Sequence, residues 1–329
     1  YCSSEAFYPL LTPHPDWAEE NPLQIVESVE KVIKETAAEL RYKNCLLQGI
    51  ALSTVMHSFA GLDEHYEPLM DMQTWADSRS ASIVKEMKQD EKLCRSFYEK
   101  TGCPIHACYP LAKVIWLRRN HPEIFQQMRY VGSLKDYIFR GLTGEWLIDH
   151  SAASTSGMYN EKNMDWDDEI LAYADLRREQ MPKIVSTTYM SKLSSQAAVA
   201  MELPEGVPVV IGATDGVLVN VGIGAVHPGQ LSATIGTSGA LRMLTSQPMT
   251  DPKMRTWCYN LVDDMWVAGG AINNGGMILR WVRDKICHYT KAHLENLDVD
   301  GYDLMTMKAS HIPAGSEGLI MLPCFTGER

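Results

Sequence analysis

The stretch VPVVIGATDGVLVNVGIGAVHPGQLSATIGTSGALRML, residues 207–244, contains two strand patterns, each followed by glycines and polar side chains. Its first part, Val207–Ile211, has the length and the β-branched content of a buried strand. The strand is predicted to end at Gly212-Ala213-Thr214-Asp215-Gly216. Two glycines there would let the backbone approach a ligand closely around the carboxylate of Asp215.

The second strand pattern, Leu231–Ile235, leads into a predicted tight turn at Gly236-Thr237-Ser238-Gly239. Such a turn offers backbone N–H groups and two hydroxyls, which suit a phosphate. A carboxylate followed by a phosphate-binding hairpin predicts phosphoryl transfer to a substrate hydroxyl. The alternative is a strand with an Asx-type turn and an ordinary hairpin, because short motifs bracketed by glycines recur by chance.

The composition is that of a globular protein, with 329 residues, 45% apolar and 22% charged. This length predicts about two domains. The net charge of -11 argues against nucleic acid as a partner. A small anionic ligand is still compatible with it, because local backbone dipoles can bind anions.

The eight cysteines are dispersed, without a CxxC pair or the spacing of a zinc site. We therefore expect free thiols in a reducing cytoplasm and no resident metal centre. An apolar run of about 18 residues, which a membrane span needs, is absent from the sequence.

Local signals predict helices and strands along the whole chain. Asn21-Pro22 predicts a helix start, with an N-cap and a proline at the first helical position, and apolar residues from Ile25 to Leu40 share one face. The other predicted elements are a strand over Cys45–Leu52, a helix after Arg79, short helices at 91–100, 110–119, 134–141 and 167–176, and a helix over Met277–Ile286.

This alternation of strands and helices predicts an α/β fold. The sequence is helix-rich before Val207 and hairpin-rich after it. We therefore place a domain boundary near residue 211, with a first domain over 1–211 and a second over 212–329.

A loop after the first predicted strand carries Met56 and His57, and Trp75, Asp77 and Arg79 follow about twenty residues later. A sugar site needs an apolar or aromatic face for the C–H side and polar groups for the hydroxyls. These side chains would supply both. The alternative is a core tryptophan with surface charges and a structural histidine.

Glycine-rich segments at 268–271 and 273–276 precede the last predicted helix. Its N-terminus would be open to an anion or a nucleotide. The alternative is an asparagine N-cap with close glycine packing. The sequence has no GxxxxGK[ST] motif, and Gly222, Gly224 and Gly229 have the wrong spacing for GxGxxG.

Together these segments resemble the FGGY family of carbohydrate kinases, most closely its gluconokinase-like branch. The resemblance implies an actin-like, hexokinase-like ATPase fold of two domains with a cleft. The matching segments are ALSTVMHSFAGLD (51–63), TWADSRS (74–80), TGCPIHACYPLAK (101–113), SLKDYIFRGLTG (133–144), GATDGVLVNVGIGAV (212–226), TIGTSGALR (234–242), AGGAINNGG (268–276) and PCFTGER (323–329).

The resemblance also implies a role for each candidate residue. Asp215 would be the general base that accepts the proton of the attacking hydroxyl. The residues implied at the sugar are Met56, His57 and Trp75, with Asp77 and Arg79 nearby; those implied at ATP are Gly236, Thr237 and Ser238 on the phosphates and Gly276 and Arg280 toward the nucleotide.

The implied activity is ATP- and Mg²⁺-dependent phosphorylation of a sugar or sugar acid, with gluconate as the expected acceptor and a homodimer as a candidate assembly. Alternatives are another acceptor of the family (xylulose, ribulose, a pentitol or glycerol) or a catalytically silent sugar-binding protein on the same fold. Gluconate carries a carboxylate, so its site should include a cation. Arg79 would supply that cation, although it could equally pair with Asp77.

The resemblance places the family's N-terminal phosphate loop, with its metal-associated aspartate, before residue 1. It places the rest of the second domain, with the adenosine-binding segment, after Arg329. We therefore expect a chain truncated at both ends that binds ATP poorly by itself.

Overall fold

The computed structural model describes residues 2–287 and 300–325. By its contacts the chain divides into two compact units. Unit 1 comprises Tyr1–Gln230 and Met243–Ala268, and unit 2 comprises Leu231–Arg242 and Gly269–Arg329. The domain boundary near residue 211 stays a prediction, because compact units defined by contacts need not coincide with domains of a family.

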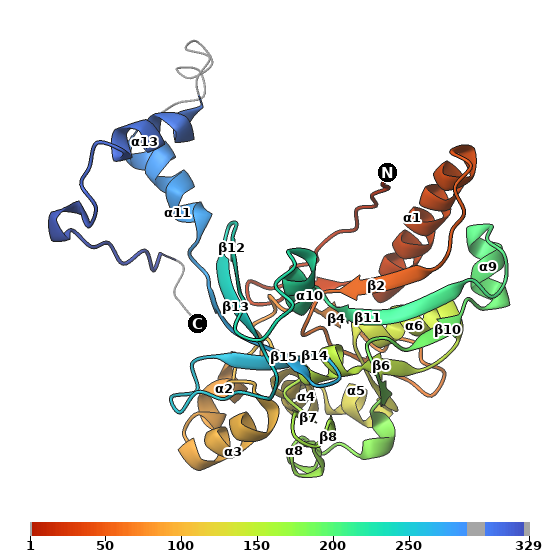
Figure 1. Cartoon of the computed structure of the whole chain (residues 1–329). Helices are drawn as coiled ribbons and strands as arrows, with labels where there is room; N and C mark the ends of the chain where they lie inside the picture. Colours follow the sequence, from red (N-terminus) through yellow and green to blue (C-terminus); the bar gives the residue numbers. More distant parts are fainter. Residues whose placement is uncertain (1, 288–299, 326–329) are drawn as a thin grey trace. The chain divides into compact units, whose positions relative to one another are not determined.

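Figure 1 labels many of the helices and strands. The helices are α1 (Pro22–Tyr42), α2 (Ala81–Met87), α3 (Glu91–Thr101), α4 (Pro110–Asn120), α5 (Pro122–Gln127), α6 (Leu134–Thr143), α7 (His150–Ser154), α8 (Asp168–Tyr173), α9 (Ser195–Met201), α10 (Asp215–Gly222), α11 (Gly276–Trp281) and α13 (Gly301–Ala309), with short 3-10 or π turns η1 (Arg178–Gln180), η2 (Val282–Ile286) and η3 (Ser316–Gly318).

The strands are short, as expected where helices separate most of them. They are β1 (Glu19–Glu20), β2 (Ile50–Thr54), β3 (Ala60–Leu62), β4 (Met72–Gln73), β5 (Tyr130–Gly132), β6 (Leu147–Asp149), β7 (Tyr159–Asn160), β8 (Asp165–Trp166), β9 (Lys183–Val185), β10 (Met190–Lys192), β11 (Pro208–Thr214), β12 (Leu231–Ile235), β13 (Gly239–Thr245), β14 (Trp257–Val262) and β15 (Met265–Ile272).

Helices with strong local signals lie where the sequence predicts them. In α1 the Asn21 side chain accepts hydrogen bonds from the amides of Leu23 and Gln24 at 3.0 and 3.1 Å. The helices α2, α3, α4 and α6 are likewise confirmed. The predicted helix at 167–176 is shorter in the structure, because Asp175 adopts a left-handed conformation with φ 63° that ends α8.

The sheet that leads to Asp215 has the strand order β10-β11-β2, with β11 parallel to β2 (Figure 1). The sequence-based ends of both parallel strands are wrong. β2 begins at Ile50, the residue that pairs with Val209, rather than at the predicted Cys45. β11 continues through the predicted turn to Thr214, so Asp215 is the first residue of a helix.

A bulge in this parallel pair explains why β11 contains a glycine. The register shifts between Val210 and Ala213, and Gly212 between them has φ 68°. A Cβ at Gly212 would collide with the backbone oxygen of Leu52 on the neighbouring strand. The sequence predicts that Gly212 makes room for a ligand; the structure shows that it makes room for β2.

Helices α1, α6 and α9 pack together, and α6 packs on β11. The buried side chains between these elements include Ile25, Phe139, Met201, Val209 and Ile211. Because this apolar core holds β11 against helices on one side, the position of the strand's carboxyl end is well determined within unit 1.

Unit 2 contains the predicted hairpin, since β12 spans Leu231–Ile235 and pairs with β13. The predicted helix over Met277–Ile286 is α11 followed by the π turn η2. The last four residues of the motif at 323–329 lie outside the described residues.

All eight cysteines are free thiols, as predicted. Among the described helices, none has both the length and the apolar character needed to cross a membrane.

Candidate active site

Asp215 lies where β11 passes into α10, and its side chain is exposed. The residue before it is firmly held: the amide of Thr214 donates to Ser151 Oγ at 3.2 Å, and the two side-chain hydroxyls are 2.8 Å apart. The carboxylate is thus accessible to a bound ligand, on a backbone that is fixed through Thr214. The arrangement suits proton acceptance from a bound hydroxyl.

Met56 contacts the backbone beside Asp215. A Cβ on Gly216 would collide with the terminal methyl group of Met56, so a larger residue there would require the Met56 side chain to shift. The second glycine of the Gly212–Gly216 segment therefore leaves room for the Met56 side chain, and the approach of a ligand there stays a prediction. The contact brings two of the predicted site residues, Met56 and Asp215, to one place in unit 1.

His57 is held in a strained conformation by contacts on several sides. Its φ is 65°, in the left-handed region that non-glycine residues rarely adopt. Its Nδ1 lies 2.8 Å from the carbonyl oxygen of Thr155, and its ring packs edge-to-face on Tyr109 and Tyr259. Backbone strain of this kind clusters at functional sites.

Trp75 is 52% exposed, in the loop that follows β4. The alternative that it is a core residue is therefore wrong. The loop is anchored on both sides of the indole. The Thr74 amide donates to the carbonyl of Ala18 at 2.9 Å, and the Ala18 amide donates to the Asp77 carboxylate at 2.8 Å.

Asp77 and Arg79 form a buried cluster with Glu19. The Arg79 guanidinium lies 2.7 Å from Asp77 Oδ2 and 2.6 Å from Glu19 Oε1, and it lies over the Trp17 ring at 3.6 Å. Its side chain is only 3% exposed. The pairing with Asp77, one of the two sequence-based alternatives, is thus present. Direct contact of Asp77 or Arg79 with a sugar stays a prediction.

Two buried lysines that the sequence analysis did not single out hold the backbone of these segments. Lys113 on α4 donates to the carbonyls of His57 and Thr74 at 2.6 and 2.7 Å. Lys135 on α6 donates to the carbonyls of Ile211 and Ala213 on β11 at 2.6 and 3.1 Å, and it lies 3.6 Å from the Asp149 carboxylate.

Burial lowers the pKa of Lys113 to about 7. Burial also lowers the pKa of Lys135, although the carboxylate of Asp149 opposes this. For Lys113, the signal in the sequence was a single lysine within the apolar helical run Leu111–Leu117, because lysines are seldom fully buried without a partner.

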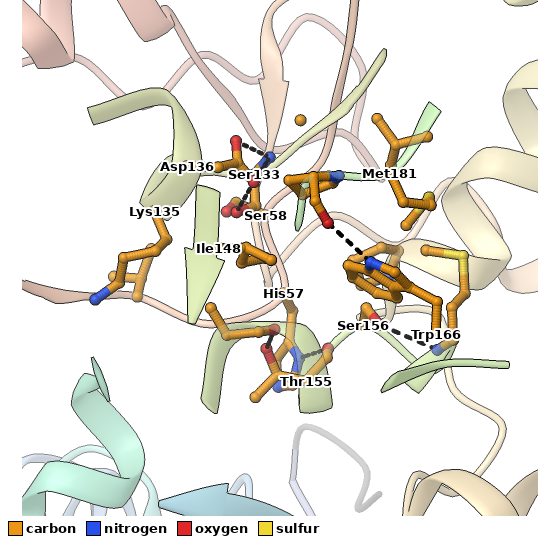
Figure 2. A pocket seen from close by; sticks show the side chains of 17 residues that line it. His57, Ser58, Ser133, Lys135, Asp136, Ile148, Thr155, Ser156, Trp166 and Met181 are labelled. Carbon is orange, nitrogen blue, oxygen red and sulfur yellow. Dashed lines mark hydrogen bonds between the residues drawn. The ribbon is translucent and has the colours of Figure 1, made fainter. Parts of the chain in front are cut away.

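A pocket lies beside His57 in unit 1 but does not include the other candidate residues (Figure 2). It is lined by Ser133, Asp136 and Trp166 among others, whereas Met56, Trp75 and Asp215 are not part of its lining. Its polar side chains bond within the protein, as when Trp166 donates to the carbonyl of Pro182 at 2.9 Å. Burial raises the pKa of Asp136, which caps α6, to about 8. Of the predicted sugar residues, His57 alone lines this pocket.

The predicted phosphate turn and the start of α11 lie together in unit 2. The amide of Gly276 donates to the carbonyl of Gly236 at 2.6 Å, and the amides of Gly275 and Met277 donate to that of Thr237 at 3.0 and 3.4 Å. A Cβ on Gly275 would lie 2.6 Å from the Ser238 backbone. These glycines therefore permit close packing of two backbone segments.

This packing distinguishes the two sequence-based alternatives for the start of α11. Its first amides donate to carbonyls of the turn, so the close glycine packing is present, although the N-cap residue is Gly275 rather than an asparagine. The side of the site that stays accessible is the turn itself, since Gly236, Thr237 and Ser238 are exposed. Arg280 is exposed one helical turn after Gly276.

Within residues 2–287 and 300–325, no three His, Cys, Asp or Glu side chains form a group that could hold a metal ion.

A sequence profile of the N-terminal domain of the FGGY family of carbohydrate kinases matches residues 2–222. The chain belongs to this family.

Its relatives include gluconokinases. The chain is 39% identical over 323 residues to the gluconokinase of Bacillus subtilis (strain 168), a match that covers 98% of this chain and 62% of the relative. The chain thus spans about three fifths of the length of the gluconokinases it matches.

Solved structures of the family share the fold. The crystal structure of gluconate kinase from Lactobacillus acidophilus matches with a TM-score of 0.91 at 31% identity, covering 98% of this chain and 63% of that one. Ligand-bound xylulose kinase from the same organism matches with a TM-score of 0.90 at 31% identity, covering 98% and 64%. The expected actin-like ATPase fold is confirmed.

Proposed function

We propose that this chain is the acceptor-binding and base-bearing part of a kinase that transfers the γ-phosphate of ATP to a hydroxyl of gluconate. The observation that supports gluconate as the acceptor is the 39% identity to gluconokinase over 98% of the chain. Two observations in unit 1 support a site for the reacting hydroxyl: Met56 contacts the backbone beside Asp215, and Lys113 links the His57 segment to the segment before Trp75.

In this proposal Asp215 accepts the proton of the attacking hydroxyl. Met56 packs beside it, and His57 and Trp75 orient the sugar, since positioning and electrostatics account for most of the catalysis of phosphoryl transfer. Gly236, Thr237 and Ser238 contact the phosphates, while Gly276 and Arg280 lie toward the nucleotide. Mg²⁺ enters with ATP, because it is held largely by substrate phosphates and water.

A second candidate acceptor is a neutral ketose such as xylulose. Two observations favour keeping it: the xylulose kinase structure matches nearly as well as the gluconate kinase structure, and Arg79 is engaged by two carboxylates. The cation that would recognise a sugar acid is therefore not supplied by Arg79 without breaking a buried cluster.

An acceptor panel separates the two candidates. We expect the full-length protein to phosphorylate gluconate with a kcat/KM at least about tenfold above that for xylulose, ribulose or glycerol, because a site built for a substrate's polar groups rejects analogues that lack them. ATP consumption is measured with each acceptor in turn. A higher kcat/KM for a neutral ketose would overturn gluconate as the acceptor and leave the family assignment intact.

Replacing Trp75 by Ala should weaken acceptor binding by about tenfold, in line with the roughly 1.5 kcal/mol that an aromatic contact adds. ATP affinity and the unfolding midpoint should hardly change, because the indole is half exposed. Calorimetric titration of each ligand tests this. Tyr173→Ala, which removes another part-exposed aromatic ring of unit 1, is the control. Equal losses for both ligands would show that Trp75 does not act on the acceptor.

A further inference from the structure

We propose that Lys113 is a positioning residue that sets the two acceptor-binding segments, at His57 and at Trp75, in their relative places. The proposal deepens the proposed function and rests on it where sugar binding is concerned. Its structural part, that the Lys113 side chain holds two separate loops together, rests on the geometry of unit 1 alone.

The geometry is that of a clamp between two backbones. Lys113 Nζ lies 2.6 Å from the carbonyl oxygen of His57 and 2.7 Å from that of Thr74. One of these carbonyls belongs to a predicted acceptor residue, and the other belongs to the residue immediately before Trp75. Both segments are loops, so neither carbonyl belongs to a regular helix or strand ladder, and the Thr74 carbonyl accepts one further hydrogen bond, from the Asp77 amide at 3.1 Å.

The surroundings of Lys113 show why the side chain cannot be replaced by any residue of similar size. It is fully buried on α4, between Ala112 and Val114. An ammonium group in such a place is unfavourable unless it is hydrogen-bonded. An apolar residue would fill the space, but it would leave two buried carbonyls without this donor.

One of the two carbonyls that Lys113 binds belongs to a residue with a strained backbone conformation. His57 holds a left-handed conformation, which persists only where neighbouring structure enforces it. On its far side the Trp75 loop is held by the Asp77 carboxylate, through the Ala18 amide. The two segments are also joined by the backbone bridge between Phe59 and Gln73, with hydrogen bonds of 3.0 and 2.8 Å. Lys113 adds a side-chain link at His57 and Thr74 themselves, whereas Asp77 fixes the Trp75 loop to the N-terminal region.

The test compares Lys113→Met with Gln180→Met. Gln180 is also buried and also donates to a backbone carbonyl, that of Met128 at 3.0 Å, but it touches neither acceptor segment. In the full-length protein we expect Lys113→Met to lower kcat/KM for gluconate by about ten- to a hundredfold, as misplacement of about 1 Å can do. The KM for ATP should stay within about twofold, and Gln180→Met should change neither value much.

Hydrogen exchange provides a readout that does not depend on activity. Amides of residues 55–58 and 74–77 should exchange faster in Lys113→Met than in the parent protein, with no such change in Gln180→Met. If Lys113→Met does not fold, Lys113→Gln takes its place, since a shorter amide side chain can reach at most one carbonyl and should show a smaller change in the same direction.

The outcomes are distinguishable. Unchanged exchange at both loops would overturn the clamp, whatever the acceptor is. Faster exchange in a protein whose parent does not phosphorylate gluconate would support the clamp and reject the proposed acceptor. Equal losses for gluconate and ATP, matched by Gln180→Met, would show that Lys113 contributes only to general stability and would overturn the positioning role.

Discussion

Replacing Asp215 by Asn is expected to lower kcat about 10²- to 10⁴-fold, the range that a general base contributes. The amide keeps the size of the side chain but cannot take the proton of the attacking hydroxyl. Acceptor binding and the unfolding midpoint should be nearly unchanged, because Asp215 is exposed and its backbone is held through Thr214 and Ser151. Steady-state kinetics on the full-length protein, with calorimetric titration of gluconate, measure both effects.

Asp168→Asn is the matched control, since it removes another exposed carboxylate of unit 1, one that pairs with Arg178 at the surface. It should leave kcat within about twofold, because surface ion pairs contribute little. Near-normal turnover in Asp215→Asn would show that another group accepts the proton. A large loss in gluconate affinity would instead make Asp215 a binding residue.

Replacing Arg79 by Met is expected to reduce the free energy of unfolding by about 3–5 kcal/mol, as occurs when one partner of a buried ion pair is removed. The Asp77 side chain is completely buried, and Glu19 is 10% exposed. Without the guanidinium, both carboxylates would lie buried without their cation, and the cation–π contact with Trp17 would be lost. Urea unfolding followed by circular dichroism measures the change.

Arg178→Met is the comparison, because Arg178 also bridges two carboxylates, Asp165 and Asp168, but at the surface. The Arg178→Met substitution should reduce the free energy of unfolding by less than about 1 kcal/mol. Similar small losses in both variants would contradict the structural role of Arg79. A rise in KM for gluconate alone, in an Arg79→Met protein of unchanged stability, would instead support the direct contact that the sequence predicts.

Sequence patterns predicted the elements whose signals lie within a few neighbouring residues. Asn21 and Pro22 predicted the start of α1 because an N-cap bonds to amides two and three residues on. The prediction of a strand over Leu231–Ile235 matched β12, because β-branched residues lie within this stretch and turn residues flank it in the chain. The motif resemblance predicted the family and the candidate residues, of which Met56 and Asp215 prove to be neighbours.

Tertiary structure alone decided the features that depend on residues far apart in the chain. The ends of β2 and β11 follow from their mutual pairing and from the bulge at Gly212, which no local propensity encodes. Arg79 pairs with Glu19, and Lys113 meets His57 and Thr74, across dozens of residues. A charged side chain can be buried only where distant segments bring it a partner. Its role is therefore set when the segments pack together, and the sequence around it carries no sign of that partner.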